Sequence, residues 1–111
     1  MINAGIIGTG NIGTDLLLKI LKTDYIKPVI FAGRRMDSDG IKIAESKGVT
    51  VTDQGINYFI KNPRCCDVVY DCTSAADAIE HAKIFKAQGI KVIDLTPAKV
   101  GPLCVLSIVI I

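Results

Sequence analysis

Three glycines near the start of the chain constrain its fold more than any other feature. Gly8, Gly10 and Gly13 follow an apolar, β-branched segment over residues 2–7, and they open a segment over 11–22 whose apolar residues recur at helical spacing. The pattern Gly-x-Gly-x-x-Gly between a strand and a helix is typical of a dinucleotide-binding turn. The first glycine permits the tight bend, the second admits a pyrophosphate, and the third lets the helix pack closely on the strand.

The rest of the chain continues to alternate between strands and helices. Apolar strands between amphipathic helices indicate a parallel sheet covered on both faces, and half of the 111 residues are apolar. We therefore predict an α/β fold, a Rossmann-type doubly wound, mostly parallel sheet with helices on both faces, as one dinucleotide-binding domain over residues 1–111. The further strands are expected over 26–32, 49–52, 67–71, 91–95 and 105–111, and the helices over 41–47, 54–61 (capped by Asp53) and 75–88 (capped by Ser74).

On such a fold we expect a nicotinamide cofactor at the glycine turn. The N–H groups of the first helical turn face the phosphates, and the helix dipole adds to their attraction. The alternative is an ordinary strand–turn–helix unit with chance glycines. The place of the motif in the first strand–helix unit favours cofactor binding.

The tip of the second strand leaves the choice between NAD and NADP open. NAD-binding versions of the fold carry an acid there that binds the ribose 2′-hydroxyl. This chain has Arg34 and Arg35 instead, with Asp37 and Asp39 slightly later. An arginine suits a 2′-phosphate through paired hydrogen bonds, which makes NADP an alternative to NAD. The opposing interpretation is that both arginines are solvated loop residues.

Charge and cysteine content argue against several other functions. Thirteen basic against eleven acidic side chains give a net charge of +2, too weak and scattered for nucleic acid or an anionic membrane. No apolar stretch reaches the roughly 18–20 residues of a membrane span. The four cysteines match no paired zinc pattern, so no metal is expected. The first residues lack a secretory signal, and reduced thiols in a cytoplasmic protein are the expectation.

Five sequence blocks resemble a known family. They recur in the order and spacing of the acylating acetaldehyde dehydrogenases, the partners of 4-hydroxy-2-oxovalerate aldolase in the meta-cleavage breakdown of aromatic compounds. The resemblance runs from the N-terminus to about Val105. Its blocks are GTGNIGTDL at 8–16, DSDG at 37–40, DCTSA at 71–75, IDLTPA at 93–98 and GP at 101–102.

The resemblance implies a reaction and its partners. Members of the family convert acetaldehyde, coenzyme A and NAD⁺ to acetyl-CoA and NADH, through a cysteine thiolate that attacks the aldehyde. Homodimers and an aldolase partner are implied as well. The resemblance places the family's cofactor contacts at Thr9, Gly10, Asn11 and Ile12. Ser74 follows the fourth strand, at the edge of the sheet where ligands sit. The cofactor-binding residues that we predict in all are Gly8, Thr9, Gly10, Asn11, Ile12, Gly13, Arg34 and Ser74.

The chain also departs from the family pattern. The family's catalytic cysteine stands in a Thr-Cys-Gly context within a second, dimer-forming domain beyond residue 111. We therefore expect no catalytic residue here, and a chain that holds cofactor without turnover. Leu106 stands where the family usually has a proline. Arg34-Arg35 stands at the tip of the second strand, where the commoner family form has an acidic residue. Two alternatives are a non-enzymatic NAD(P)-binding module or truncation product, and the cofactor domain of a semialdehyde dehydrogenase.

The remaining reactive side chains favour structural roles. Cys72 lacks an evident base and is expected as a small buried residue, and Cys104 lacks the Thr-Cys-Gly context. His81 lies off the apolar stripe of its helix and is expected at the surface or its boundary. Asp71 and Asp94 end strands at the ligand edge, where such residues usually bond to loop N–H groups or cap a helix. Cys65 and Cys66 are expected to be structural or incidental.

Overall fold

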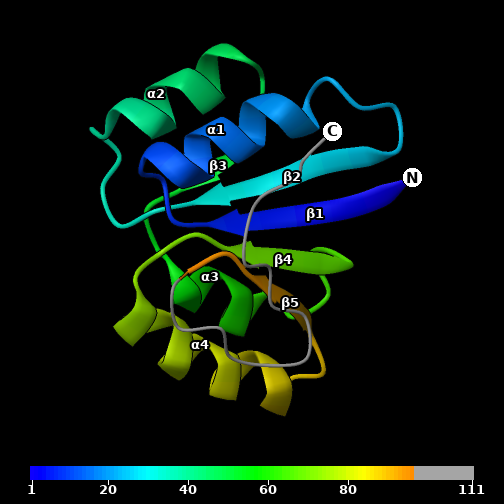
Figure 1. Cartoon of the computed structure of the whole chain (residues 1–111), viewed down its shortest axis with the longest axis vertical. Coiled ribbons are helices and arrows are strands. Elements are labelled where there is room, and N and C mark those ends of the chain that lie inside the picture. The colour runs from blue at the N-terminus through cyan, green and yellow to red at the C-terminus, as the bar shows by residue number, and fades with distance from the viewer. Residues whose placement is uncertain (97–111) are drawn as a thin grey trace.

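Five parallel strands form one sheet through the middle of the molecule (Figure 1). The structure is a computed structural model, and it describes residues 1–96. The strand order is β3-β2-β1-β4-β5, and every described pairing is parallel. The strands are β1 (Ile2–Ile7), β2 (Ile26–Ala32), β3 (Val51–Thr52), β4 (Val68–Asp71) and β5 (Lys91–Asp94). The strand expected over 105–111, and Cys104, lie outside the described residues.

Two pairs of helices cover the two faces of this sheet. Figure 1 shows α1 and α2 on one face and α3 and α4 on the other. The predicted doubly wound α/β fold is therefore confirmed. The helices are α1 (Asn11–Ile20), α2 (Asp39–Ser46), α3 (Ile56–Lys61) and α4 (Ala75–Ala87).

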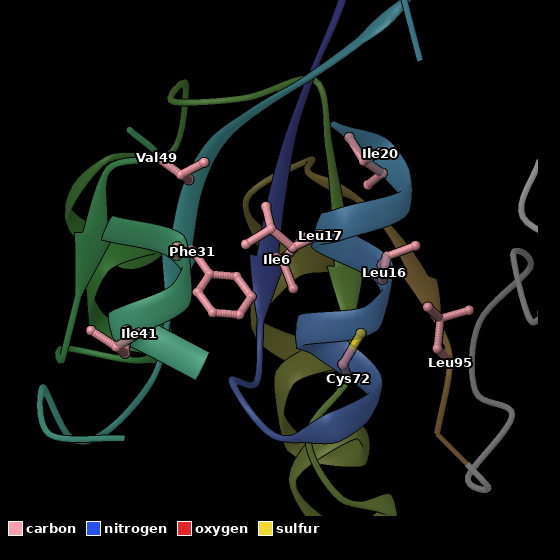
Figure 2. Close-up of a cluster of buried hydrophobic side chains, with 10 residues drawn as sticks. Ile6, Leu16, Leu17, Ile20, Phe31, Ile41, Val49, Cys72 and Leu95 are labelled. Atoms are coloured by element: carbon pink, nitrogen blue, oxygen red, sulfur yellow. The ribbon is translucent and has the colours of Figure 1, made fainter. Parts of the chain in front are cut away.

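Each face of the sheet has its own apolar core. On the first face, Ile6 and Phe31 of the sheet pack against Leu17 of α1 and Ile41 of α2, all of them buried (Figure 2). On the second face, the rings of Phe59 and Phe85 meet edge to face at 5.6 Å. Burying a side chain of this size stabilises the fold by about 1.5–3 kcal/mol, so these two layers fix the helices on the sheet.

The start of β2 shows how a proline fits into an inner strand. Ala4 pairs with Pro28 but Gly5 pairs with Ile30, so Val29 is skipped where the register shifts. Proline has no N–H to donate to a ladder. It is accommodated because the two-residue β3 pairs only with the far end of β2, at Phe31 and Ala32. The carboxyl end of β2, where the site forms, keeps a regular ladder.

Two predicted helix starts are wrong. Helix α2 begins at Asp39, not at residue 41, and the Ser38 hydroxyl caps it. Helix α3 begins at Ile56, not at residue 54, and Asp53 does not cap it. Its N-cap is Gly55 at φ +54°, a conformation that glycine adopts readily. The Thr52 hydroxyl instead accepts a hydrogen bond from the Gln54 N–H at 3.2 Å. The Gly55 N–H, a donor that an Asp53 cap would need, bonds to the Gly33 carbonyl at 2.9 Å, so the helix starts later. The cap expected at Ser74 is confirmed.

The sheet order creates a crevice at the carboxyl end of β1. The chain moves outward from β1 through β2 to β3, and then returns to place β4 on the other side of β1. Connections therefore leave the ends of β1 and β4 in opposite directions. Ligands of open α/β sheets bind at such a switch point, and the glycine turn begins there, at Gly8.

Candidate functional site

A cleft of about 830 Å³ opens at this switch point. Segments from both sides of the sheet line it: the glycine turn, the loops after β2, β3 and β4, and the first turns of α3 and α4. The cleft has room for a nucleotide-sized ligand, since small-molecule sites commonly measure about 300–1,000 Å³. Its polar and charged lining includes Thr9, Arg34, Arg35, Ser38, Asp53, Gln54, Asn57, Lys61, Thr73, Ser74, Asp77 and His81.

The glycine turn folds as its spacing predicts. Gly8 has φ +107°, and its N–H bonds to the Ala32 carbonyl at 2.8 Å. Residues with side chains rarely adopt this φ. Gly13 lies buried in α1 against the turn, and a Cβ there would overlap the Gly8 carbonyl oxygen. The tasks expected of the first and third glycines, a tight bend and close packing of helix on turn, are therefore seen in the structure.

Helix α1 begins without a side-chain cap. Its N-cap is Gly10, whereas Ser38 and Ser74 cap α2 and α4 with hydroxyls that accept from Ile41 and Asp77 N–H groups. A Cβ built on Gly10 would meet nothing within 4 Å. The N-terminus of α1 thus combines uncapped N–H groups with open space beside Gly10, which lines the cleft, and this arrangement suits a phosphate.

The other residues predicted in the turn are divided between the cleft and its surroundings. Thr9 lines the cleft, and its hydroxyl lies 3.4 Å from that of Ser38. Asn11 lines a neighbouring hollow of about 460 Å³ between α1 and α2. Ile12 is 47% exposed and lies outside the described lining of both. Of the eight predicted residues, the structure places Gly8, Thr9, Gly10, Arg34 and Ser74 together along the cleft.

The two arginines after β2 have different partners. Arg34 reaches across to α4, where its guanidinium donates to Asp77 Oδ2 at 3.2 Å. Arg35 donates twice to the nearby Asp37, at 2.8 and 2.9 Å. This paired bond and the arginine's charge lower the pKa of Asp37 from its usual value. Both arginines line the cleft, but Arg34 makes the longer, single contact and is the more readily available to a ligand.

A buried carboxylate organises the turn between β4 and α4. Asp71 Oδ1 accepts from the Thr73 N–H at 3.0 Å and from the Thr73 hydroxyl at 2.5 Å. Asp94, its register neighbour on β5, holds Thr96 in the same way, at 2.7 and 2.6 Å. Bonding to loop N–H groups was one of the two roles expected of these aspartates. The turn holds Ser74 at the rim of the cleft.

Sequence reasoning missed the partner of His81. His81 Nδ1 lies 3.0 Å from Asp71 Oδ2, with the two side chains only 12% and 2% exposed. The boundary position expected for His81 is confirmed, but the ring also lines the cleft. The two residues are ten apart and on different elements. The signal available was that the helix after β4 must pack back onto β4.

Cys72 lies in the apolar core, as expected. Its side chain points toward α1 among Leu16 and Leu95 (Figure 2). Burial, with the nearby charges of Asp71 and Asp94, raises the pKa of the Cys72 thiol to about 12. Burial likewise raises the pKa of Cys66 to about 12. A nucleophilic cysteine needs the opposite shift, a lowered thiol pKa.

Comparison with known proteins identifies the family. The chain matches the family described as semialdehyde dehydrogenase, NAD binding domain, over residues 3–100. The chain belongs to this family. The cofactor predicted from the glycine turn is thereby confirmed as NAD, and the fold as that of an NAD-binding domain of dehydrogenases.

Relatives of this NAD-binding domain are acetaldehyde dehydrogenases. One from Spirochaeta aurantia is 51% identical over 104 residues, and one from Pectobacterium atrosepticum is 47% identical over 107 residues. These matches cover 94% and 96% of the present chain but 35% and 36% of the relatives. The chain therefore spans about a third of their length. The expected resemblance to acetaldehyde dehydrogenases is confirmed, and the semialdehyde dehydrogenase alternative is not better supported.

A solved structure shows the same fold at lower identity. The aspartate semialdehyde dehydrogenase with NADP from Candida albicans superposes with a TM-score of 0.66 and 20% identity, over 87% of this chain and 30% of that one. At this identity the likeness concerns the fold alone. Across residues 1–96, no helix has the length and apolar character required to cross a bilayer.

Proposed function

We propose that this chain is the cofactor-binding part of a coenzyme A-acylating aldehyde dehydrogenase, and that the cleft binds NAD with its pyrophosphate over the glycine turn. One observation carries the placement: α1 begins uncapped at Gly10, at the switch point of the sheet, with open space where a side chain would otherwise stand. An anion placed there is bound by N–H groups that have no side-chain cap.

Different cleft residues then contact different parts of the bound cofactor. Thr9 and Gly10 line the pyrophosphate region, because they form the turn itself. The adenosine half extends toward the tip of β2, where Arg34 stands, since the fold places the adenosine ribose at that tip. Ser74 borders the turn from the β4 side. Asn11, Ile12 and Gly13 supply the first-turn N–H groups of α1.

Arg34 provides a test of cofactor choice. Its single 3.2 Å contact to Asp77 can be exchanged for a 2′-phosphate, whereas Arg35 is held twice by Asp37. We propose that Arg34 allows NADP to bind beside NAD. In calorimetric titrations, Arg34→Ala is expected to weaken NADP binding about tenfold, the effect of one hydrogen bond to a charged group, with little change for NAD.

The matched control for that titration is Arg35→Ala. It removes the same charge from the neighbouring position, and we expect it to change the ratio of the two affinities much less. Equal weakening of NAD and NADP by Arg34→Ala would contradict the assignment of Arg34 to the 2′ position. A larger effect of Arg35→Ala would assign that position to Arg35.

The aldehyde chemistry needs a thiol that the described cleft does not supply. When bound, the nicotinamide accepts a hydride from the substrate. The family's Thr-Cys-Gly block occurs nowhere in these 111 residues, and Cys72 is buried with a raised pKa. We therefore propose that the thiol, the coenzyme A site, the dimer contacts and the surface for an aldolase partner belong to the two thirds of the relatives that this chain does not span.

The direct test uses the 111-residue chain itself. Calorimetry is expected to show NAD binding, and absorbance at the NADH band is expected to stay flat with acetaldehyde, coenzyme A and NAD together. Robust NADH formation would contradict the proposal that the catalytic thiol lies outside this chain. Cys72→Ala and Cys104→Ala would then identify the thiol. Absence of NAD binding would contradict the cofactor site.

A further inference from the structure

His81 lines the cleft from the second turn of α4, in the part that the proposed placement of NAD gives to the adenosine. Beyond Arg34, the cleft continues between α3 and α4, where Asn57 and His81 line it. The imidazole is 88% buried, given its 12% exposure, so its position is fixed by packing and only a small part of it meets the cleft. The rings of Phe85 and His81 pack edge to face, with their centroids 6.3 Å apart. A polar atom held this rigidly is suited to a directional hydrogen bond with a bound ligand.

Asp71 decides which nitrogen of His81 carries the proton. The Asp71 carboxylate can only accept hydrogen bonds, so Nδ1 at 3.0 Å from Oδ2 is the donor. In a neutral imidazole the other nitrogen, Nε2, is then an acceptor. Among residues 1–96, the bond through Nδ1 is the ring's only hydrogen bond. Nε2 is therefore the ring atom left to accept a hydrogen bond, in a side chain that lines the cleft.

We propose that Nε2 of His81 accepts a hydrogen bond from the 6-amino group of adenine, and so makes this cleft selective for adenine dinucleotides. The inference rests on the proposed placement of NAD. On the adenine ring, the 6-amino group is the only strong donor, and the ring nitrogens are acceptors. An acceptor such as Nε2 can pair only with the amine. Hypoxanthine carries a carbonyl oxygen at that position, which sets acceptor against acceptor.

The hydrogen bonds of Asp71 also predict how Asp71→Asn would change the tautomer of His81. Thr73 donates twice to Oδ1, from its N–H and its hydroxyl. In Asp71→Asn the amide oxygen must take that place, so the amide NH₂ faces His81 in place of Oδ2. An NH₂ group donates to Nδ1, which moves the imidazole proton to Nε2. His81 then presents a donor to the cleft, which suits the hypoxanthine carbonyl.

The test compares NAD with nicotinamide hypoxanthine dinucleotide by calorimetry, using the whole chain at mildly alkaline pH. The native chain is expected to bind NAD about three- to tenfold more tightly, the effect of one neutral hydrogen bond. His81→Phe is expected to remove the preference, and Asp71→Asn to reverse it. Glu80→Gln, which alters an exposed pair with Lys83 on the same helix, is expected to keep the native preference.

The outcomes distinguish a failure of the adenine contact from a failure of the proposed NAD site. If the native chain binds NAD but does not distinguish the two dinucleotides, the adenine contact is overturned while the proposed site stands. If it distinguishes them but His81→Phe retains the full preference, another residue reads the base and the inference fails. If the native chain binds neither, the proposed placement of NAD fails first. Thermal unfolding of each variant separates lost folding from lost recognition, and the native comparison holds even if a variant does not fold.

Discussion

Gly13→Ala is expected to unfold the domain under conditions in which the native chain is stable. The added Cβ would overlap the Gly8 carbonyl oxygen, and both atoms belong to the backbone. A flexible side chain cannot relieve this overlap, so either α1 or the β1 turn must shift. Because Leu16 and Leu17 of α1 fill the core over β1, such a shift also disturbs the packing. We expect a loss of about 3 kcal/mol, the upper part of the range for overpacked sites.

Circular dichroism during heating and urea titration measures this effect. A loss of that size lowers Tm by roughly 10–20 °C in a domain of this length. NAD binding is expected to fall along with it, because the variant distorts the turn itself. A variant with native Tm would mean that α1 stands further from the turn than the structure places it.

Much of the fold could be predicted because local patterns and tertiary needs agree. The strand before Gly8 is apolar and β-branched, and the helix after it has one apolar face, so both are also what a parallel sheet requires. Ser38 and Ser74 have cap chemistry at the positions where the helices begin. The start of α3 was mispredicted because the Gly55 N–H bonds to Gly33 after β2, a contact between separate segments that the local sequence does not encode.

The site was only half predictable, for a physical reason. Gly8, Gly10 and Gly13 are close in sequence, so their spacing alone describes the turn. Asp71 and His81 meet only because α4 packs back across β4, and Arg34 meets Asp77 across the mouth of the cleft. Those contacts depend on the relative positions of whole elements. No spacing rule along the chain encodes them, even though each helix and strand found in residues 1–96 was expected.

Gly10→Ala is expected to leave the fold intact and to abolish most of the NAD affinity. Gly10 has φ −77°, which alanine adopts without strain, and a Cβ there meets no atom within 4 Å. Replacing glycine at a compatible position commonly adds about 0.4–1 kcal/mol of stability, because the unfolded chain becomes less flexible. The same methyl group occupies the space in which we place the pyrophosphate. Losing close N–H contacts to a charged phosphate costs about 1.5–3 kcal/mol, or roughly ten- to a hundredfold in Kd.

The two alanine substitutions form a matched pair, since they add the same methyl group three residues apart. Gly13→Ala is expected to lower Tm sharply, whereas Gly10→Ala is expected to keep Tm and to raise the Kd for NAD. Packing of the protein alone cannot produce the second result, because nothing in residues 1–96 touches the added Cβ. Gly10→Ala with native Tm and native affinity would show that the pyrophosphate lies elsewhere. The uncapped start of α1 would then need another ligand to explain it.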